Sequence, residues 1–294
     1  MPVPTEKDLN DGQVLAETLY ISLDPAMRGY TVNIYPDRES YFPPVQVGET
    51  MKGPAIVRII ASKSSKAQAG DIVTGWPGWQ ELAVLNDNTF DAPFPLPPNG
   101  RVSDLMGVLG LTGLTAYYGI EKIADVHPGE TVVVSGAAGA TGSVAGQIAK
   151  IKGARVIGIA GSEDKVRWLK NELGFDEALN YKDKNFAQKF EEVTPDLIDV
   201  YWDNVGGEIL DLALGRAQNH ARFVMLQGFI VLDFAAENLQ ARTQLSQWIA
   251  EGKLSRKETI IKGGLGAAER GLLDLFYGRN IGKLLVEIKD PSTL

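Results

Sequence analysis

The sequence contains no cysteine and only two histidines, His127 and His220. Without cysteine the chain can form no disulfide bond, supply no thiolate nucleophile and build no zinc site from cysteine and histidine. Each histidine lies in a turn-like stretch before an expected strand, and we interpret both as exposed turn residues rather than catalytic groups. These absences remove much of the chemistry that enzymes commonly use.

The chain also lacks an excess of positive charge and a long apolar run. Its net charge of −8 disfavours nucleic acid or an anionic membrane as a partner. No apolar run is long enough to span a bilayer, and no signal peptide precedes the charged stretch Glu6–Asp11. We therefore expect a cytoplasmic globular protein, and 294 residues suffice for one large or two ordinary domains.

The most informative stretch runs from Thr131 to Leu169. It opens with a β-branched, apolar strand, Thr131–Val134, as expected of a strand buried on both faces. Small residues with three glycines follow, then an amphipathic helix pattern and a second strand at Arg155–Ala160. Such a strand–turn–helix–strand unit predicts a dinucleotide site, in which glycines let the backbone approach a pyrophosphate at the helix N-terminus. The alternative is a tight helix–strand contact that binds no ligand.

The following residues continue the α/β pattern. Further strands are predicted at Ala178–Tyr181, Ile198–Val205 and Ala221–Leu226, with helices at Phe186–Glu192 and Glu208–Gln218. Ligands of open α/β sheets bind at the carboxyl ends of the strands. The pattern therefore places Gly136–Gly142, Ser162, Tyr181 and Asn204 along one crevice.

Residues 1–107 show no sustained helical periodicity. Short β-rich runs occur at Val14–Ser22, Ala55–Ala61 and Asp71–Gly75, and Val45–Met51 and Gln80–Leu85 could add further strands. Many prolines exclude long regular elements. We predict an irregular, antiparallel β-domain.

An apolar run at Phe229–Phe234 resembles a sixth strand but begins only two residues after the fifth. Adjacent parallel strands need a crossover of about a dozen residues or more. The run could be an antiparallel hairpin partner, part of one long bent strand, or the far side of a segment missing between Met225 and Leu226. We favour the missing segment.

The end of the second strand indicates which nicotinamide cofactor is bound. NAD sites place an acidic residue there for the ribose 2′-hydroxyl. Here Gly161-Ser162 follows the strand, with Lys165 shortly after, and Glu163 and Asp164 lie in the helix start, where acids also serve as caps. A hydroxyl and a lysine suit a 2′-phosphate, so NADP(H) is favoured, the alternative being a solvated helix N-terminus.

Six stretches in order give a more specific indication. They are ISLDPAMRG (21–29), GLTGLTAYYG (110–119), AAGATGSVAGQIAKIKGARVIGIAGS (137–162), YWDNVGGE (201–208), WIAEGKL (248–254) and GRNIGKLLV (278–286). Together they resemble the zinc-independent double-bond reductase branch of the medium-chain dehydrogenase/reductase superfamily, which includes prostaglandin, alkenal and curcumin reductases. The resemblance implies an α/β fold: a Rossmann doubly wound parallel sheet (109–262) plus an irregular GroES-like β-domain (1–108 and 263–294). It also implies NADPH-dependent reduction of the C=C bond of small, apolar α,β-unsaturated ketones and aldehydes, and a homodimer with its contact around Phe229–Phe234.

The same resemblance assigns residues to the cofactor. The pyrophosphate would contact Gly139, Ala140, Thr141 and Gly142, and the 2′-phosphate would contact Lys165 and Tyr181, with Ser162 nearby. The nicotinamide would lie beside Phe229, Ile230 and Val231. Asn204 follows the fourth strand, and Asn280 would close the site. From the residues alone, Tyr181, Phe229 and Ile230 could equally be core residues, and Lys165 a surface lysine. In relatives a nicotinamide loop, and a helix with a tyrosine often assigned as proton donor, lie where this chain joins Met225 to Leu226.

Hydride transfer to the β-carbon develops negative charge on the carbonyl oxygen, which needs hydrogen-bond donors. Tyr41 and Arg28 are the candidates for this catalytic role, and Tyr41 could instead be a packing aromatic. Trp76 and Trp79 could line an apolar substrate cleft or pack in the core. Two other functions remain open: quinone reduction on the same scaffold, and NADPH binding without catalysis.

Overall fold

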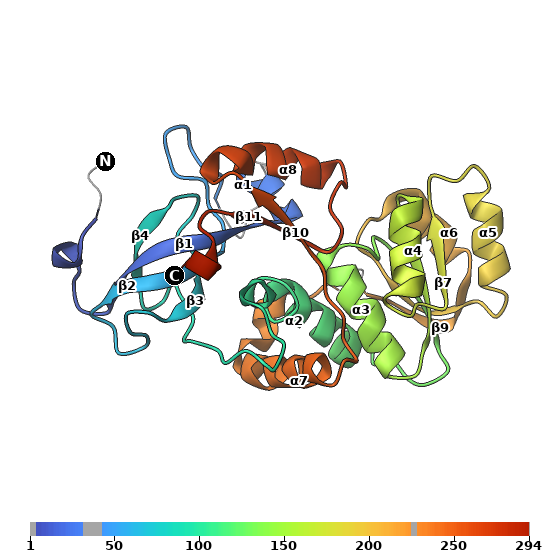
Figure 1. The fold of residues 1–294 in the computed structure, drawn as a ribbon. Coiled ribbons are helices and arrows are strands. Elements are labelled where there is room, and N and C mark those ends of the chain that lie inside the picture. Colours follow the sequence, from blue (N-terminus) through green and yellow to red (C-terminus); the bar gives the residue numbers. More distant parts are fainter. Residues whose placement is uncertain (1–3, 32–42, 225–227, 294) are drawn as a thin grey trace.

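The computed structural model describes residues 4–31, 43–224 and 228–293, which form two sheets side by side (Figure 1). The strands are β1 (Gln13–Leu23), β2 (Ala55–Ser62), β3 (Ile72–Gly75), β4 (Leu82–Asn86), β5 (Thr131–Val134), β6 (Arg155–Ala160), β7 (Glu177–Asn180), β8 (Ile198–Trp202), β9 (Ala217–Val224), β10 (Glu258–Lys262) and β11 (Lys283–Glu287). The α-helices are α1 (Arg28–Thr31), α2 (Leu111–Tyr118), α3 (Ala140–Ile151), α4 (Glu163–Asn171), α5 (Phe186–Val193), α6 (Gly207–Leu214), α7 (Asn238–Ala250) and α8 (Ala268–Phe276).

The second sheet is parallel and doubly wound, in the order β7-β6-β5-β8-β9. All four residues of β5 are buried, as its β-branched sequence predicts. Helices α3 and α4 pack on one face of this sheet, together with α2 and α7, whereas α5 and α6 pack on the other. The predicted Rossmann architecture is confirmed, and β5 and β6 have the predicted bounds.

The first sheet is built around the long strand β1, which pairs with β2 and β4 in its first half and with β2 and β11 in its second. Every pairing of β1 is antiparallel. The predicted strand at Val45–Met51 is wrong: the Gln46 carbonyl accepts from the Glu49 N–H at 3.0 Å, and Gly48 takes a φ of +96°. The tight turn breaks the extended run there.

The last strands return to the first sheet. Strand β10 pairs in parallel with β11, and β11 pairs with β1, so the chain crosses from the parallel sheet back to the antiparallel one (Figure 1). Strand β11 thus lies in the same sheet as β1–β4, within residues 263–294, which the resemblance assigns to the GroES-like part. The pairing of β10 with β11 also puts Glu258–Lys262 in the first sheet, although the predicted boundary at 262/263 assigns those residues to the Rossmann part.

The predicted sixth strand at Phe229–Phe234 is also wrong. Residues Val231–Glu237 form a 3₁₀ helix, η5, which the Asp233 carboxylate starts by accepting from the Ile230 N–H at 3.0 Å. The Phe234 ring stacks on Tyr118 of α2 with centroids 4.6 Å apart, so the segment packs on a helix rather than along β9. Both strand interpretations of this run are therefore excluded. The junction itself, and the predicted missing segment, lie at residues 225–227, outside the described residues.

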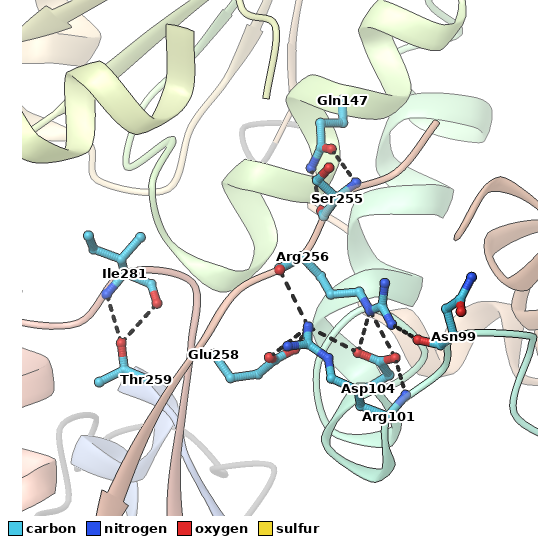
Figure 2. Close-up of polar contacts among 9 residues, drawn as sticks. All are labelled: Asn99, Arg101, Asp104, Gln147, Ser255, Arg256, Glu258, Thr259 and Ile281. Atoms are coloured by element: carbon cyan, nitrogen blue, oxygen red, sulfur yellow. Dashed lines mark hydrogen bonds and ion pairs between the residues drawn. The ribbon is translucent and has the colours of Figure 1, made fainter. Parts of the chain in front are cut away.

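Two buried carboxylates and their arginine partners fix the crossing between the sheets (Figure 2). Arg256 Nε donates to both oxygens of Asp104, at 2.8 and 2.9 Å, and the Asp104 side chain has no exposed surface. Arg101 pairs with Glu258 at 2.9 Å. Burial raises the pKa of Glu258. The charge of Arg101 lowers this pKa and the charge of Asp104 raises it further, and the net shift is upward. These pairs lock the start of β10 against the segment that leads into α2.

Candidate functional site

A groove of about 480 Å³ runs between the two sheets. One wall is formed by the carboxyl ends of β5, β6 and β8 with the turns that follow them, and the other by Leu23–Pro25, the end of α8 and the start of β11. Eight predicted cofactor residues line this groove: Gly139, Ala140, Thr141, Gly142, Lys165, Tyr181, Asn204 and Asn280. The sequence-derived crevice is therefore a real cavity, closed by a segment from the far end of the chain.

The glycine turn exposes backbone donors to the groove. Gly139 is the N-cap residue of α3, and no side chain caps this helix. A Cβ on Gly142 would lie 2.6 Å from the Gly136 carbonyl oxygen and 3.0 Å from Ala137 Cα, so only glycine fits between turn and helix. Helix N–H groups without a capping side chain suit a phosphate group. The turn thus fits the pyrophosphate of a dinucleotide.

Cationic and aromatic side chains gather at the ends of β6 and β7. Lys165 Nζ donates to the Gly278 carbonyl oxygen at 2.7 Å, and burial, helped by the charge of Lys182, lowers the pKa of Lys165. Lys182 Nζ lies 5.7 Å from the centroid of the Tyr181 ring, which is 46% exposed. This end of the groove fits a further phosphate group. Tyr181 is an exposed residue here rather than a core residue.

Ser162 has a different position from the one expected. It is the N-cap residue of α4, its hydroxyl accepts from the Lys165 N–H at 3.4 Å, and it is not among the residues that line the groove. In this conformation its oxygen caps the helix.

Asn204 lines the groove but also holds the ends of two strands together. Its amide donates to the Ser135 carbonyl at 2.8 Å, while its oxygen accepts from the Trp202 indole N–H at 3.0 Å. The Asn204 N–H donates to the Ser135 hydroxyl at 2.8 Å. This side chain positions the turn after β8 against the turn after β5.

The wall opposite the glycine turn contains groups that sequence reasoning missed. The Gly282 N–H donates to the Ala138 carbonyl at 2.9 Å, and Gly282 forms a parallel bridge with Gly139. Gly282 has a φ of +68°, and a Cβ there would lie 1.9 Å from the Lys257 carbonyl oxygen. Beside it, Lys283 is only 4% exposed and pairs with Asp24. In the sequence, only Gly282 and Lys283 of the GRNIGK stretch could have indicated this contact between the two walls.

The remaining predicted residues are not gathered at the groove. Phe229, Ile230 and Val231 do not line it; Phe229 and Val231 pack against the core that contains α2 and α7. Arg28 begins α1 as an exposed residue outside the groove lining. Tyr41 lies outside the described residues.

The two tryptophans offered for a substrate cleft do not line the groove either. Trp79 packs against the core of the first sheet, and Trp76 is 40% exposed.

The described part of the chain offers neither a metal site nor a membrane-spanning helix. It holds no cluster of three or more His, Asp or Glu side chains arranged to bind a metal ion. Its helices include none with the length and apolar character needed to cross a bilayer.

Comparisons with known proteins agree with this geometry. Residues 3–92 match the family described as "N-terminal domain of oxidoreductase", and residues 140–245 match "Zinc-binding dehydrogenase". The NADPH-dependent curcumin reductase of Escherichia coli is 34% identical over 95% of this chain and 88% of its own length. Prostaglandin reductase 1 of Bos taurus is 36% identical over 95% and 90%. The crystal structure of CurA in complex with NADPH from Vibrio vulnificus superposes with a TM-score of 0.90 at 32% identity, covering 99% of this chain and 93% of that one.

Proposed function

Because the chain belongs to the zinc-independent double-bond reductase branch of the medium-chain dehydrogenase/reductase superfamily, we propose that it reduces the C=C bond of α,β-unsaturated ketones and aldehydes. The chain is an NADP-dependent oxidoreductase with NADP(H) as its cofactor. The likeness to curcumin and prostaglandin reductases supports C=C reduction. The groove supports the cofactor, since it combines an uncapped helix N-terminus with cationic side chains at the next strand ends. Its lining fits a dinucleotide that bears a third phosphate.

The residues of the groove bind and orient the cofactor. The turn at Gly139–Gly142 would hold the pyrophosphate with backbone N–H groups, and Lys165 and Tyr181 would hold the 2′-phosphate. Asn280 donates its amide to the Gly282 carbonyl at 2.8 Å and so stiffens the opposite wall. Bound NADPH supplies the hydride, and the protein supplies orientation and a site sheltered from water.

The reduction also needs a donor for the carbonyl oxygen and a proton for the α-carbon. Negative charge develops on that oxygen as the hydride reaches the β-carbon, and a donor aimed at it stabilises the transition state. Tyr41 and Arg28 stay the proposed donors to that oxygen, and a tyrosine or water supplies the proton that the α-carbon takes up. Tyr41→Phe lowers kcat if Tyr41 donates, and an unchanged kcat removes it from the mechanism.

The experiment that tests the proposal compares four kcat/KM values. An alkenal or enone and a quinone are each offered with NADPH and with NADH. We expect the enone with NADPH to give the highest value. Faster quinone turnover would make the chain a quinone reductase, and NADPH binding without any turnover would make it a non-catalytic binding protein.

Four finer features belong to the same proposal. The homodimer contact expected around Phe229–Phe234 cannot be a strand edge, because Val231–Glu237 is a 3₁₀ helix packed on α2, so a homodimer would use β9, the last strand in the order of the parallel sheet. Light scattering measures the mass that tests this. The substrate is expected to be small and apolar, and the protein cytoplasmic. The alignment with YfmJ of Bacillus subtilis spans 324 positions, more than the 294 residues of this chain, so the relative has positions that this chain lacks, and we propose that they fall between Met225 and Leu226. That alignment covers 99% of this chain at 40% identity.

A further inference from the structure

Three lysines line the groove, and they lie at two different places along it. Lys165 and Lys182 are at the ends of β6 and β7, whereas Lys283 begins β11 on the opposite wall. We propose that Lys283 is a pyrophosphate-binding residue, contributed across the groove to face the glycine turn. The proposal rests on NADP(H) as the cofactor and is independent of the substrate.

The backbone fixes Lys283 beside the turn. Gly282, its neighbour, is bridged to Gly139 and donates its N–H to the Ala138 carbonyl at 2.9 Å. The Lys283 N–H donates to the Lys257 carbonyl at 3.0 Å, which pins the start of β11 on its other side. Lys283 therefore cannot move away from the turn without breaking the contact between the two walls.

The turn itself supplies little charge for a pyrophosphate. The first turn of α3 contains no acidic residue, and the residues Ala140, Thr141, Gly142 and Ser143 provide no cation either. A helix N-terminus carries the equivalent of about half a positive charge, less than the charge of the two phosphates. A side-chain donor near the turn would add hydrogen bonds to the phosphate oxygens. Of the groove-lining lysines, Lys283 is the one on the wall opposite the turn, where its ammonium group is shared with the Asp24 carboxylate that also lines the groove.

The Lys283 side chain is held in place before any ligand arrives. It is 5% exposed, and its ammonium group donates to one carboxylate oxygen of Asp24, whose other oxygen accepts from the Ser22 hydroxyl. A buried ammonium without a partner is strongly disfavoured, so Asp24 is the positioning residue that holds the Lys283 side chain in the groove wall. An ammonium group can donate three hydrogen bonds, which leaves capacity for phosphate oxygens.

The experiment separates pyrophosphate binding from 2′-phosphate binding. Dissociation constants of Lys283→Met are measured by calorimetry for NADPH, for 2′-phospho-ADP-ribose, which keeps the pyrophosphate, and for 2′-AMP, which lacks it. We expect Kd to rise roughly 10- to 100-fold for the first two ligands and to stay unchanged for 2′-AMP. Lys165→Met, in contrast, weakens all three. Lys262→Met, which removes the same charge from a side chain that is 76% exposed outside the groove, changes none.

Two further variants separate binding from folding. Asp24→Asn/Lys283→Met removes both charges together and leaves no unpaired buried ion, so it should fold and still show the loss for NADPH. Lys283→Arg keeps the charge and should recover most of the affinity. The proposal is overturned if the NADPH Kd of Lys283→Met or of Asp24→Asn/Lys283→Met stays within twofold of the parent. It is also overturned if Lys283→Met weakens 2′-AMP binding as much as NADPH binding. Because no substrate is used, a failure of enone reduction would not affect these outcomes.

Discussion

The two ends of the groove present different chemical groups to the cavity. At the glycine turn, the groups that face the cavity are backbone N–H groups, held by the close contact between Gly142 and the Gly136 carbonyl. At the ends of β6 and β7 they are the side chains of Lys165, Tyr181 and Lys182. The N–H groups of the turn cannot be removed by truncating a side chain of the turn, only displaced by adding one, and they do not titrate; Lys283, proposed to face them, comes from the opposite wall. A side-chain site can be truncated and responds to pH. The difference makes the two ends separable by experiment.

The largest effect should come from adding one methyl group to the backbone end. Gly142→Ala places a Cβ 2.6 Å from the Gly136 carbonyl oxygen, so the turn must move and its N–H groups lose their alignment. We expect NADPH affinity to fall at least about 100-fold and the free energy of unfolding to drop by roughly 1–3 kcal/mol. Fluorescence titration measures the NADPH affinity, and urea unfolding measures the free energy of unfolding. Gly266→Ala is the control, because a Cβ there meets no atom within 4 Å; equal losses in both variants would contradict the explanation.

The crossing between the sheets provides a second test, since it holds the walls without touching the ligand. Asp104→Asn leaves the buried Arg256 guanidinium without its carboxylate and should lower the free energy of unfolding by about 3 kcal/mol. Asp91→Asn removes a carboxylate that is 54% exposed from a similar pair with Arg242 and should cost less than about 1 kcal/mol. The NADPH Kd of folded protein should change little in both. A large change in the NADPH Kd of Asp104→Asn would mean that the crossing between the sheets, rather than the groups that line the groove, sets the affinity for NADPH.

At the side-chain end, Lys165→Met should weaken NADPH binding roughly 10- to 100-fold while leaving the Kd of NADH almost unchanged. The physical reason is that NADH lacks the phosphate that Lys165 is proposed to hold. Parallel titrations of the two cofactors check this. If both affinities fall together, Lys165 acts through its contact with Gly278 instead.

The smallest effect concerns pH. Burial and the charge of Lys182 lower the pKa of Lys165, and only protonated Lys165 attracts a phosphate. Affinity for 2′-AMP should therefore fall as pH rises through this lowered pKa, at a lower pH than for an ordinary lysine. Lys182→Met removes the repulsion, so the fall should move to higher pH, with a modest loss of affinity at neutral pH. A fall at an unchanged pH would show that burial alone sets the pKa.

The sequence predicted one wall of the groove far better than the other. Strands β5 and β6 have the predicted bounds, and the predicted helix follows the glycine turn as α3, because their signals are local: buried β-branched runs, a glycine turn, then helical spacing. The opposite wall has no such signal, since Lys283 meets Asp24 across 259 positions of the chain. The run at Phe229–Phe234 was misread because an apolar run fits a strand or a helix packed on aromatic rings equally well, and only the stack on Tyr118 distinguishes them.

The bridge between Gly139 and Gly282 also has a consequence for biosynthesis. A ribosome finishes the glycine turn and all five strands of the parallel sheet before it makes Gly282 and Lys283. While the chain is being synthesised, the nucleotide-binding half can fold, but the second wall of its groove does not yet exist. Cofactor that meets the nascent protein would find only the backbone end and the lysines near β7. Tight loading must therefore wait until Gly282 and Lys283 have been made and have left the exit tunnel, later than the parallel sheet itself.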